Sequence, residues 1–206
     1  MSVNRNYWDS FYKGDNRKLS LPSQFAVFIA NEFLEKINTV FDIGCGNGRD
    51  SLFFDSIGLR VIGIDASTTS ISKLQNLQTS ARFVASDISS NQLSSSLSDL
   101  VNSQDSVLFY SRFFLHAISD QEEKYFWEFV SSFKATNTYV AVEFRTHRDE
   151  LLSKSTANHF RRFLRPSDLL ERALMHGFKC SYFTEGFGYA KYNDDDAHVA
   201  RILLSK

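Results

Sequence analysis

The chain has 206 residues, 43% of them apolar, and a formal net charge of −1. This length and apolar fraction suit one domain with a substantial core. The near-neutral charge gives no global field that would attract nucleic acid, so no nucleic-acid partner is expected. No apolar run reaches the roughly 18 residues of a membrane span, and no signal segment is expected at the N-terminus. The two cysteines, Cys45 and Cys180, indicate no disulfide framework and favour a cytoplasmic location.

Two helices are predicted before the first strand. Trp8, Phe11 and Tyr12 recur at the i, i+3, i+4 spacing of one helix face. The first helix either docks on the core or lies over a ligand as a lid. A second helix is predicted from about Ser23, a plausible cap, to Glu35.

The most specific stretch is Thr-Val-Phe-Asp-Ile-Gly-Cys-Gly-Asn-Gly-Arg-Asp, at 39–50. A short buried strand is followed by three alternate glycines, Gly44, Gly46 and Gly48, and then by an apolar helix. Glycines let the backbone turn sharply and approach a ligand closely, and the helix points its free N–H groups into the same space. The next strand ends at Asp65, whose carboxylate can accept hydrogen bonds from both hydroxyls of a ribose.

This run, with Asp65 following, resembles class I S-adenosylmethionine-dependent methyltransferases of the small single-domain type. The resemblance extends from about Tyr7 to the C-terminus and is most specific in the N-terminal half. It implies an α/β fold: a three-layer, Rossmann-like, seven-stranded, mostly parallel sheet with an antiparallel last strand and helices on both faces. It also implies one domain, 1–206, with a helical lid at about 1–35, and S-adenosylmethionine as cofactor without a metal. A plain glycine-rich turn is the alternative, and the G-x-G-x-G spacing opposes a dinucleotide site.

The resemblance also implies which residues contact the cofactor. Asp87, after the strand at 82–85, takes the position that accepts from the adenine amino group, and Ile88 packs on the ring. A lone Asp at a strand end is otherwise a helix cap. The full expected set is Asp42, Gly44, Cys45, Gly46, Asn47, Gly48, Asp65, Ala66, Asp87, Ile88, Tyr110 and Trp8.

The remaining elements follow from apolar periodicity and from turn and cap residues. In chain order they are an amphipathic helix within 89–106, a strand at 105–110, a helix beginning at 119, a strand at 138–144, a long loop at 145–165, a helix from 166 to about 176, a strand at 178–183 and a last strand at 198–204.

Methyl transfer from a sulfonium is an in-line displacement, in which positioning supplies most of the catalysis. A base is needed only if the acceptor must lose a proton. His116 is the best candidate because histidine titrates near neutrality; a structural, hydrogen-bonded histidine is the alternative. Arg112, four residues earlier, and Glu143, near the active end of a strand, complete the expected catalytic group.

A second basic group is expected to bind the acceptor, because guanidinium forks bind phosphate or carboxylate through paired hydrogen bonds. A solvated basic loop is the alternative. Arg161 and Arg162 are neighbours in the chain, and neighbouring residues of an extended segment point to opposite sides. Only one of these two arginines should therefore enter the pocket. The expected acceptor residues are Arg145, His159, Arg161, Arg162, Tyr189 and Lys191.

The segments at 159–163 and 185–191 weakly resemble methyltransferases of bacterial surface-saccharide pathways. The sequence therefore predicts methylation of a small anionic acceptor, by O-methylation of a phosphosugar, glycan end or related metabolite. The alternatives are N- or S-methylation of a metabolite and a non-catalytic, cofactor-binding regulatory subunit.

Overall fold

The computed structural model describes residues 5–14, 21–90, 92–152, 154, 159–192 and 194–206. The predicted lid and the predicted loop at 145–165 include residues 1–4, 15–20, 153 and 155–158, which lie outside the described residues. None of the described helices is long and apolar enough to cross a membrane.

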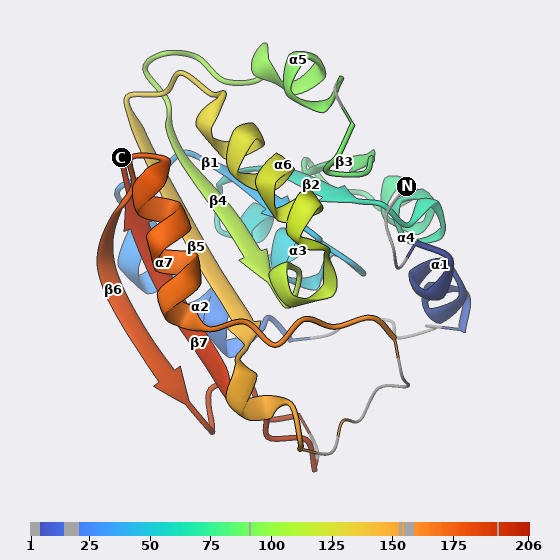
Figure 1. Cartoon of the computed structure of the whole chain (residues 1–206). Coiled ribbons are helices and arrows are strands. Elements are labelled where there is room, and N and C mark those ends of the chain that lie inside the picture. The colour runs from blue at the N-terminus through green and yellow to red at the C-terminus, as the bar shows by residue number, and fades with distance from the viewer. Residues whose placement is uncertain (1–4, 15–20, 91, 153, 155–158, 193) are drawn as a thin grey trace.

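Seven strands form one sheet in the order β3-β2-β1-β4-β5-β7-β6 (Figure 1). The first five strands run parallel, and β7 is antiparallel to both β5 and β6, which confirms the predicted fold. The strands are β1 (Thr39–Ile43), β2 (Arg60–Asp65), β3 (Arg82–Ala85), β4 (Ser106–Arg112), β5 (Asn137–Arg145), β6 (Lys179–Gly186) and β7 (Val199–Ser205).

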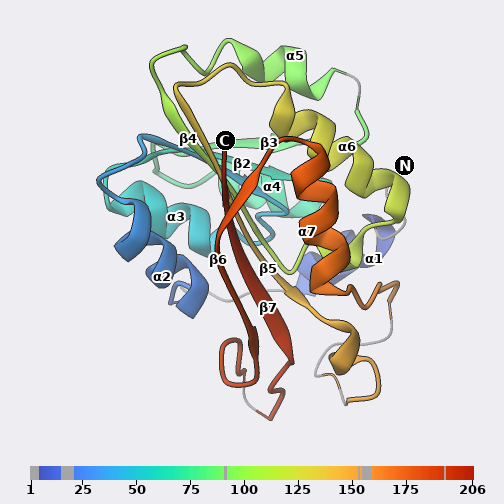
Figure 2. The same cartoon turned by 60° about the vertical axis from the view of Figure 1, so that its left-hand side comes forward.

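Helices cover both faces of the sheet (Figure 2). The helices α2 and α3 pack on one face, and α5, α6 and α7 pack on the other. Within β1, Val40 faces α2 and α3, whereas Phe41 and Ile43 face α6, because strand side chains alternate between faces. The helices are α1 (Arg5–Gly14), α2 (Gln24–Phe33), α3 (Arg49–Ser56), α4 (Thr68–Gln75), α5 (Leu93–Ser98), α6 (Asp120–Ser131) and α7 (Pro166–Met175).

Two helices show how local sequence sets their length. Ser119 caps α6 in a reciprocal capping box with Glu122, which fixes the predicted start. The helix predicted within 89–106 is shorter than expected and consists only of α5. Ser95, Ser96 and Ser98 each donate a hydroxyl to a backbone carbonyl three residues earlier, a local bond that competes with helix propagation.

Because β1 to β5 are parallel, their carboxyl ends meet at one edge of the sheet. Ligands of open α/β sheets bind at this edge, where the strand order reverses. The reversal here lies between β1 and β4, so the loops after β1, β2, β3, β4 and β5 are the place to look for the site.

Candidate functional site

The glycine loop joins β1 to α3 at this edge. Gly44, Gly46 and Gly48 have φ values of +77°, +55° and +74°, in the left-handed region that favours glycine. A Cβ on Gly44 would lie 2.6 Å from the ring of Phe114, and one on Gly46 would overlap the hydroxyl of Tyr12. Neither glycine can therefore gain a side chain without moving its surroundings.

Two aspartates lie near the ends of β1 and β2: Asp42, which is buried, and Asp65, which is partly buried. Asp65 accepts hydrogen bonds from the backbone N–H of Gly46 (2.9 Å) and of Ser67 (2.8 Å), and burial raises its pKa. Asp42 accepts the hydroxyl of Ser51 at 2.5 Å, and burial raises the pKa of Asp42 to about 7. The loop thus holds two carboxylates close to its backbone.

A narrow cavity opens from this loop toward β3 and α6, and Asp65, Ala66, Asp87 and Ile88 are among the residues that line it. One oxygen of Asp87 accepts the backbone N–H and hydroxyl of Ser89, at 3.0 and 2.8 Å. The other oxygen is buried and has no hydrogen-bond partner among the described residues. An unpaired buried acceptor is costly unless a ligand donates to it. We call this space the adenosyl cavity, because the expected adenosyl contacts Asp65, Ala66, Asp87 and Ile88 line it; the assignment of Asp65 to the ribose and of Asp87 to the base stays a prediction.

Two expected cofactor residues point their side chains away from this cavity. The thiol of Cys45 packs behind the loop in an apolar cluster with Ile71, Leu74 and Phe83. Tyr110 is fully buried. The side chains of Cys45 and Tyr110 therefore pack in the interior and do not line the cavity. Of these two residues, Cys45 contributes its backbone to the glycine loop.

Tyr110 instead belongs to a buried polar cluster under the glycine loop. Its hydroxyl donates to Asp50 at 2.8 Å. Ser23, the cap of α2, donates its backbone N–H (2.7 Å) and its hydroxyl (2.8 Å) to the same carboxylate. The cluster ties α2, α3 and β4 together, which fixes the first turn of α3 beneath the loop.

The helix α1 lies beside α4 and the glycine loop (Figure 1). Asp9 accepts the hydroxyl of Ser67 (2.6 Å) and the backbone N–H of Thr69 (3.2 Å) at the start of α4. Trp8 stacks on Tyr12, with ring centroids 6.0 Å apart. Asn47, at the turn of the loop, is half-buried. These contacts place Trp8 beside the loop; a cofactor contact by Trp8 and a lid role for α1 stay predictions.

An ion-paired cluster lies at the ends of β4, β5 and β7. The buried carboxylate of Glu143 accepts from Nε of Arg112 at 2.8 Å and from Nε of Arg201 at 2.7 Å. Although burial opposes the charge, Glu143 raises the pKa of Arg112. Among the described residues, none accepts a hydrogen bond from the two terminal amino groups of Arg112. These groups are donors that a ligand can use.

A second arginine is held next to this cluster. Arg145 donates to Asp149 at 2.7 Å and to Asp195 at 2.6 Å. The ring of Phe113 lies between the two arginines, 4.3 Å from the guanidinium carbon of Arg112 and 5.6 Å from that of Arg145. Phe113 has φ of +57° and is the only non-glycine residue with positive φ in the described part of the chain. Such backbone strain is typical of functional sites.

His116 is buried in the short helical turn after β4. Its Nδ1 accepts the backbone N–H of Arg145 at 3.3 Å, so in the neutral ring Nε2 carries the hydrogen. Burial, and then the nearby charges of Arg145 and Arg161, lower the pKa of His116 well below its usual value. The ring is therefore neutral near pH 7 and offers a donor rather than a free basic nitrogen.

The two adjacent arginines, Arg161 and Arg162, have different surroundings; which of them binds an acceptor stays a prediction. Arg162 binds the acids of α6: it pairs with Asp120 and donates to Glu123 at 2.8 Å. Arg161 is half-buried, and burial and then the charge of Arg145 lower its pKa. His159 stacks on Tyr7 of α1, with ring centroids 4.5 Å apart. Arg162 is thus engaged by α6 and by the carbonyl of Leu115, and the charges of Arg161 and Arg145 act on each other.

Tyr189 and Lys191, the two acceptor residues expected from the turn before the last strand, differ in their surroundings. The hydroxyl of Tyr189 lies 3.0 Å from the hydroxyl of Thr184, and its ring lies 4.9 Å from the guanidinium carbon of Arg201. Tyr189 therefore borders the cluster, whereas Lys191 is exposed. Sequence reasoning missed Arg201, although a single arginine within the apolar strand Val-Ala-Arg-Ile-Leu-Leu was a usable signal.

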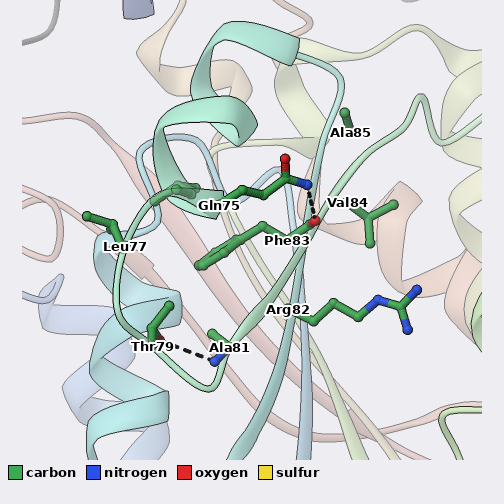
Figure 3. Close-up of a pocket in the computed structure, with 9 residues that line it drawn as sticks. Gln75, Leu77, Thr79, Ala81, Arg82, Phe83, Val84 and Ala85 are labelled. Atoms are coloured by element: carbon green, nitrogen blue, oxygen red, sulfur yellow. Dashed lines mark hydrogen bonds between the residues drawn. The ribbon is translucent and has the colours of Figure 1, made fainter.

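A larger groove lies along the edge strand β3 (Figure 3). Leu77, Thr79 and Phe83 are among its lining residues, and Gln75 closes one side by donating to the carbonyl of Phe83 at 2.9 Å. None of the predicted site residues lines it. The groove is therefore separate from the site at the strand ends.

Comparison with known proteins gives one family match and several solved structures of similar fold. Residues 40–135 match a family model described as a methyltransferase domain. A search of curated proteins found no significant match. A solved S-adenosylmethionine-dependent methyltransferase from Anabaena variabilis is 16% identical, with a TM-score of 0.72, and the match covers 98% of this chain and 93% of the other.

Two further solved structures have a similar fold. The 1,6-didemethyltoxoflavin-N1-methyltransferase of Burkholderia thailandensis, solved with S-adenosylhomocysteine, is 16% identical with a TM-score of 0.62, covering 98% of this chain and 84% of that one. The [4+2]-cyclase SpnF is 12% identical with a TM-score of 0.67, covering 99% and 92%. These three likenesses show the fold alone, and the acceptor does not follow from them. The family match spans the glycine loop, Asp65 and Asp87, so residues 40–135 form a methyltransferase domain, and S-adenosylmethionine is its cofactor.

Proposed function

We propose that this methyltransferase transfers its methyl group to an oxygen of a small anionic acceptor, a phosphosugar, glycan end or related metabolite, in the cytoplasm. The cofactor supplies an electrophilic methyl group on a sulfonium. An oxygen lone pair of the acceptor forms the new O–CH3 bond as the S–CH3 bond breaks, and sulfur keeps the electron pair as a neutral thioether. The protein's task is to hold the acceptor oxygen in line, which supplies roughly 7–11 kcal/mol.

The observation that carries the proposal is the orientation of Arg112. Glu143 holds its Nε, so the planar fork is fixed while both terminal amino groups remain available for a ligand. Arg112 lies at the end of β4, beside the reversal of strand order. A fixed fork of two donors matches a phosphate or carboxylate better than any neutral group.

The surrounding charge favours the same acceptor. Arg112, Arg145, Arg161 and Arg201 lie around this end of the sheet, and the acids that pair with them are Glu143, Asp149 and Asp195. These guanidinium groups concentrate hydrogen-bond donors for an anion at this end of the sheet.

The state of His116 bears on how the acceptor reacts. A base is required for a sugar hydroxyl but not for an oxygen that is already anionic. The Nδ1 lone pair of His116 is engaged by Arg145, and the low pKa makes His116 a weak base. We therefore assign His116 a donor role toward the acceptor through Nε2–H, instead of the general-base role expected from the sequence. Glu143, with both oxygens bound by arginine, becomes a positioning residue.

The experiment compares Arg112→Lys and Arg161→Lys with Arg165→Lys, an exposed arginine that serves as the matched control. Methyl transfer is measured on a panel of sugar phosphates, uronic acids and neutral sugars, and S-adenosylhomocysteine binding is measured by calorimetry. Arg112→Lys should raise the KM of the acceptor at least about tenfold, because lysine lacks the bidentate fork. The affinity for S-adenosylhomocysteine should not change.

Two results would contradict the proposal. If Arg112→Lys weakens S-adenosylhomocysteine binding and leaves the acceptor KM unchanged, Arg112 binds the carboxylate of the cofactor instead. If the acceptors that turn over are neutral sugars, the anionic acceptor is wrong.

A further inference from the structure

Glu122 is a buried carboxylate whose two oxygens have different surroundings. It lies in the first turn of α6 and is 6% exposed. Its Oε2 accepts the backbone N–H of Ser119 at 2.7 Å and the hydroxyl of Ser119 at 2.8 Å. Its Oε1 is buried without a hydrogen-bond partner among the described residues. The capping box therefore accounts for one oxygen only.

Glu122 lines the adenosyl cavity together with Asp87. Glu122 from α6 and Asp87 from the loop after β3 both line this cavity, and each brings one buried oxygen without a partner. Ile88, Phe114 and Ile118 line the same cavity with apolar atoms. Two unpaired acceptors in one small apolar cavity are costly, so a bound group is expected to donate to both.

A metal does not explain the two oxygens. Across the described residues, no group of three or more His, Cys, Asp or Glu side chains could hold a metal ion. Asp65 already accepts two backbone N–H groups of the loop. The missing partners of Glu122 and Asp87 are therefore hydrogen-bond donors.

We propose that Glu122 is a second adenine-recognition residue, which accepts one hydrogen of the 6-amino group while Asp87 accepts the other. An exocyclic amino group has two N–H donors, and the cavity supplies two acceptors from different elements. Glu122 thereby selects a 6-amino purine over a 6-oxo purine, whose oxygen would face two carboxylates. The inference rests on the adenosyl cofactor and is independent of the acceptor.

The substitution Glu122→Gln tests this with little change of shape. The glutamine oxygen can keep the bonds to Ser119, which directs the amide NH2 into the cavity and replaces an acceptor by a donor. Binding of S-adenosylhomocysteine and of S-inosylhomocysteine, which carries a 6-oxo group, is measured by calorimetry on each protein. Glu128→Gln, on the exposed face of the same helix, is the matched control.

We expect Glu122→Gln to weaken S-adenosylhomocysteine binding about ten- to a hundredfold. The ratio of the two affinities should fall at least about tenfold relative to wild type and to Glu128→Gln. Because both ligands are measured on one protein, a loss of folded protein cancels in the ratio. If the ratio is unchanged, Glu122 is only a helix cap and the proposal is overturned, even if both affinities fall together with the melting temperature.

Discussion

Replacing Glu143 by glutamine tests whether the arginine cluster is held as the structure shows. Each oxygen of Glu143 accepts one guanidinium, from Arg112 at 2.8 Å and from Arg201 at 2.7 Å, and the residue is 1% exposed. Glutamine offers one oxygen, and its NH2 would face the other guanidinium. Breaking a buried ion pair by removing one partner costs about 3–5 kcal/mol. We therefore expect Glu143→Gln to lose about that much of the 5–15 kcal/mol typical of a domain.

Urea unfolding, followed by circular dichroism, measures this loss. Glu150→Gln, an exposed glutamate of the following loop, should change the free energy of unfolding by no more than about 0.5 kcal/mol. If Glu143→Gln falls within about 1 kcal/mol of Glu150→Gln, Glu143 does not hold the two arginines, and the orientation of Arg112 on which the acceptor proposal rests is lost.

Three further predictions follow from the buried charges. Asp65→Ala should weaken S-adenosylhomocysteine binding by about 1.5–3 kcal/mol, measured by calorimetry, because the ribose hydroxyls lose an ionised acceptor; unchanged affinity would remove the ribose assignment. The pKa of Asp42 is about 7 in the folded protein and 3.8 ordinarily. The contribution of Asp42 to the free energy of unfolding is therefore fully present below pH 4, and it falls by about 1.4 kcal/mol per pH unit as the pH rises to about 7. Asp42→Asn should thus be more stable than wild type at pH 8 and not at pH 4, in urea unfolding at both values; the same difference at both would contradict the raised pKa. Because burial lowers the pKa of His116 below its usual 6.5, kcat/KM should show no His116-dependent inflection between pH 6.5 and 8. An inflection near neutrality that His116→Asn abolishes would restore the general base.

Local sequence predicted the backbone of the glycine loop, while the cofactor contacts of Asp65 and Asp87 stay predictions. The glycine loop, Asp65 and Asp87 follow directly from strand ends and turns, and their conformations are set within a few residues. Strand alternation also explains the burial of one expected cofactor residue. Leu108 and Tyr110 share the face of β4 that packs on α2 and α3, so Tyr110 is held in the core.

The acceptor side depends on pairings between distant segments, which periodicity does not contain. Arg201 comes 58 residues after the Glu143 that it binds, and Asp195 comes 50 residues after Arg145. Glu122 was predicted only as part of a helix start. Its proposed role in binding depends on Asp87 lining the same cavity, which the sequence does not show. These pairings can be identified only in the folded chain, where β5 lies beside β7 and α6 lies near the loop after β3.

The most direct test of the proposed function is methyl transfer to a fractionated metabolite extract. The extract is separated by anion exchange, and each fraction is incubated with the purified protein and methyl-labelled S-adenosylmethionine. We expect labelled product to form in the retained, anionic fraction, with one S-adenosylhomocysteine released per methyl transferred and the label on oxygen by mass spectrometry. Label that appears only in the unretained fraction, or only on nitrogen or sulfur, would contradict an anionic oxygen acceptor.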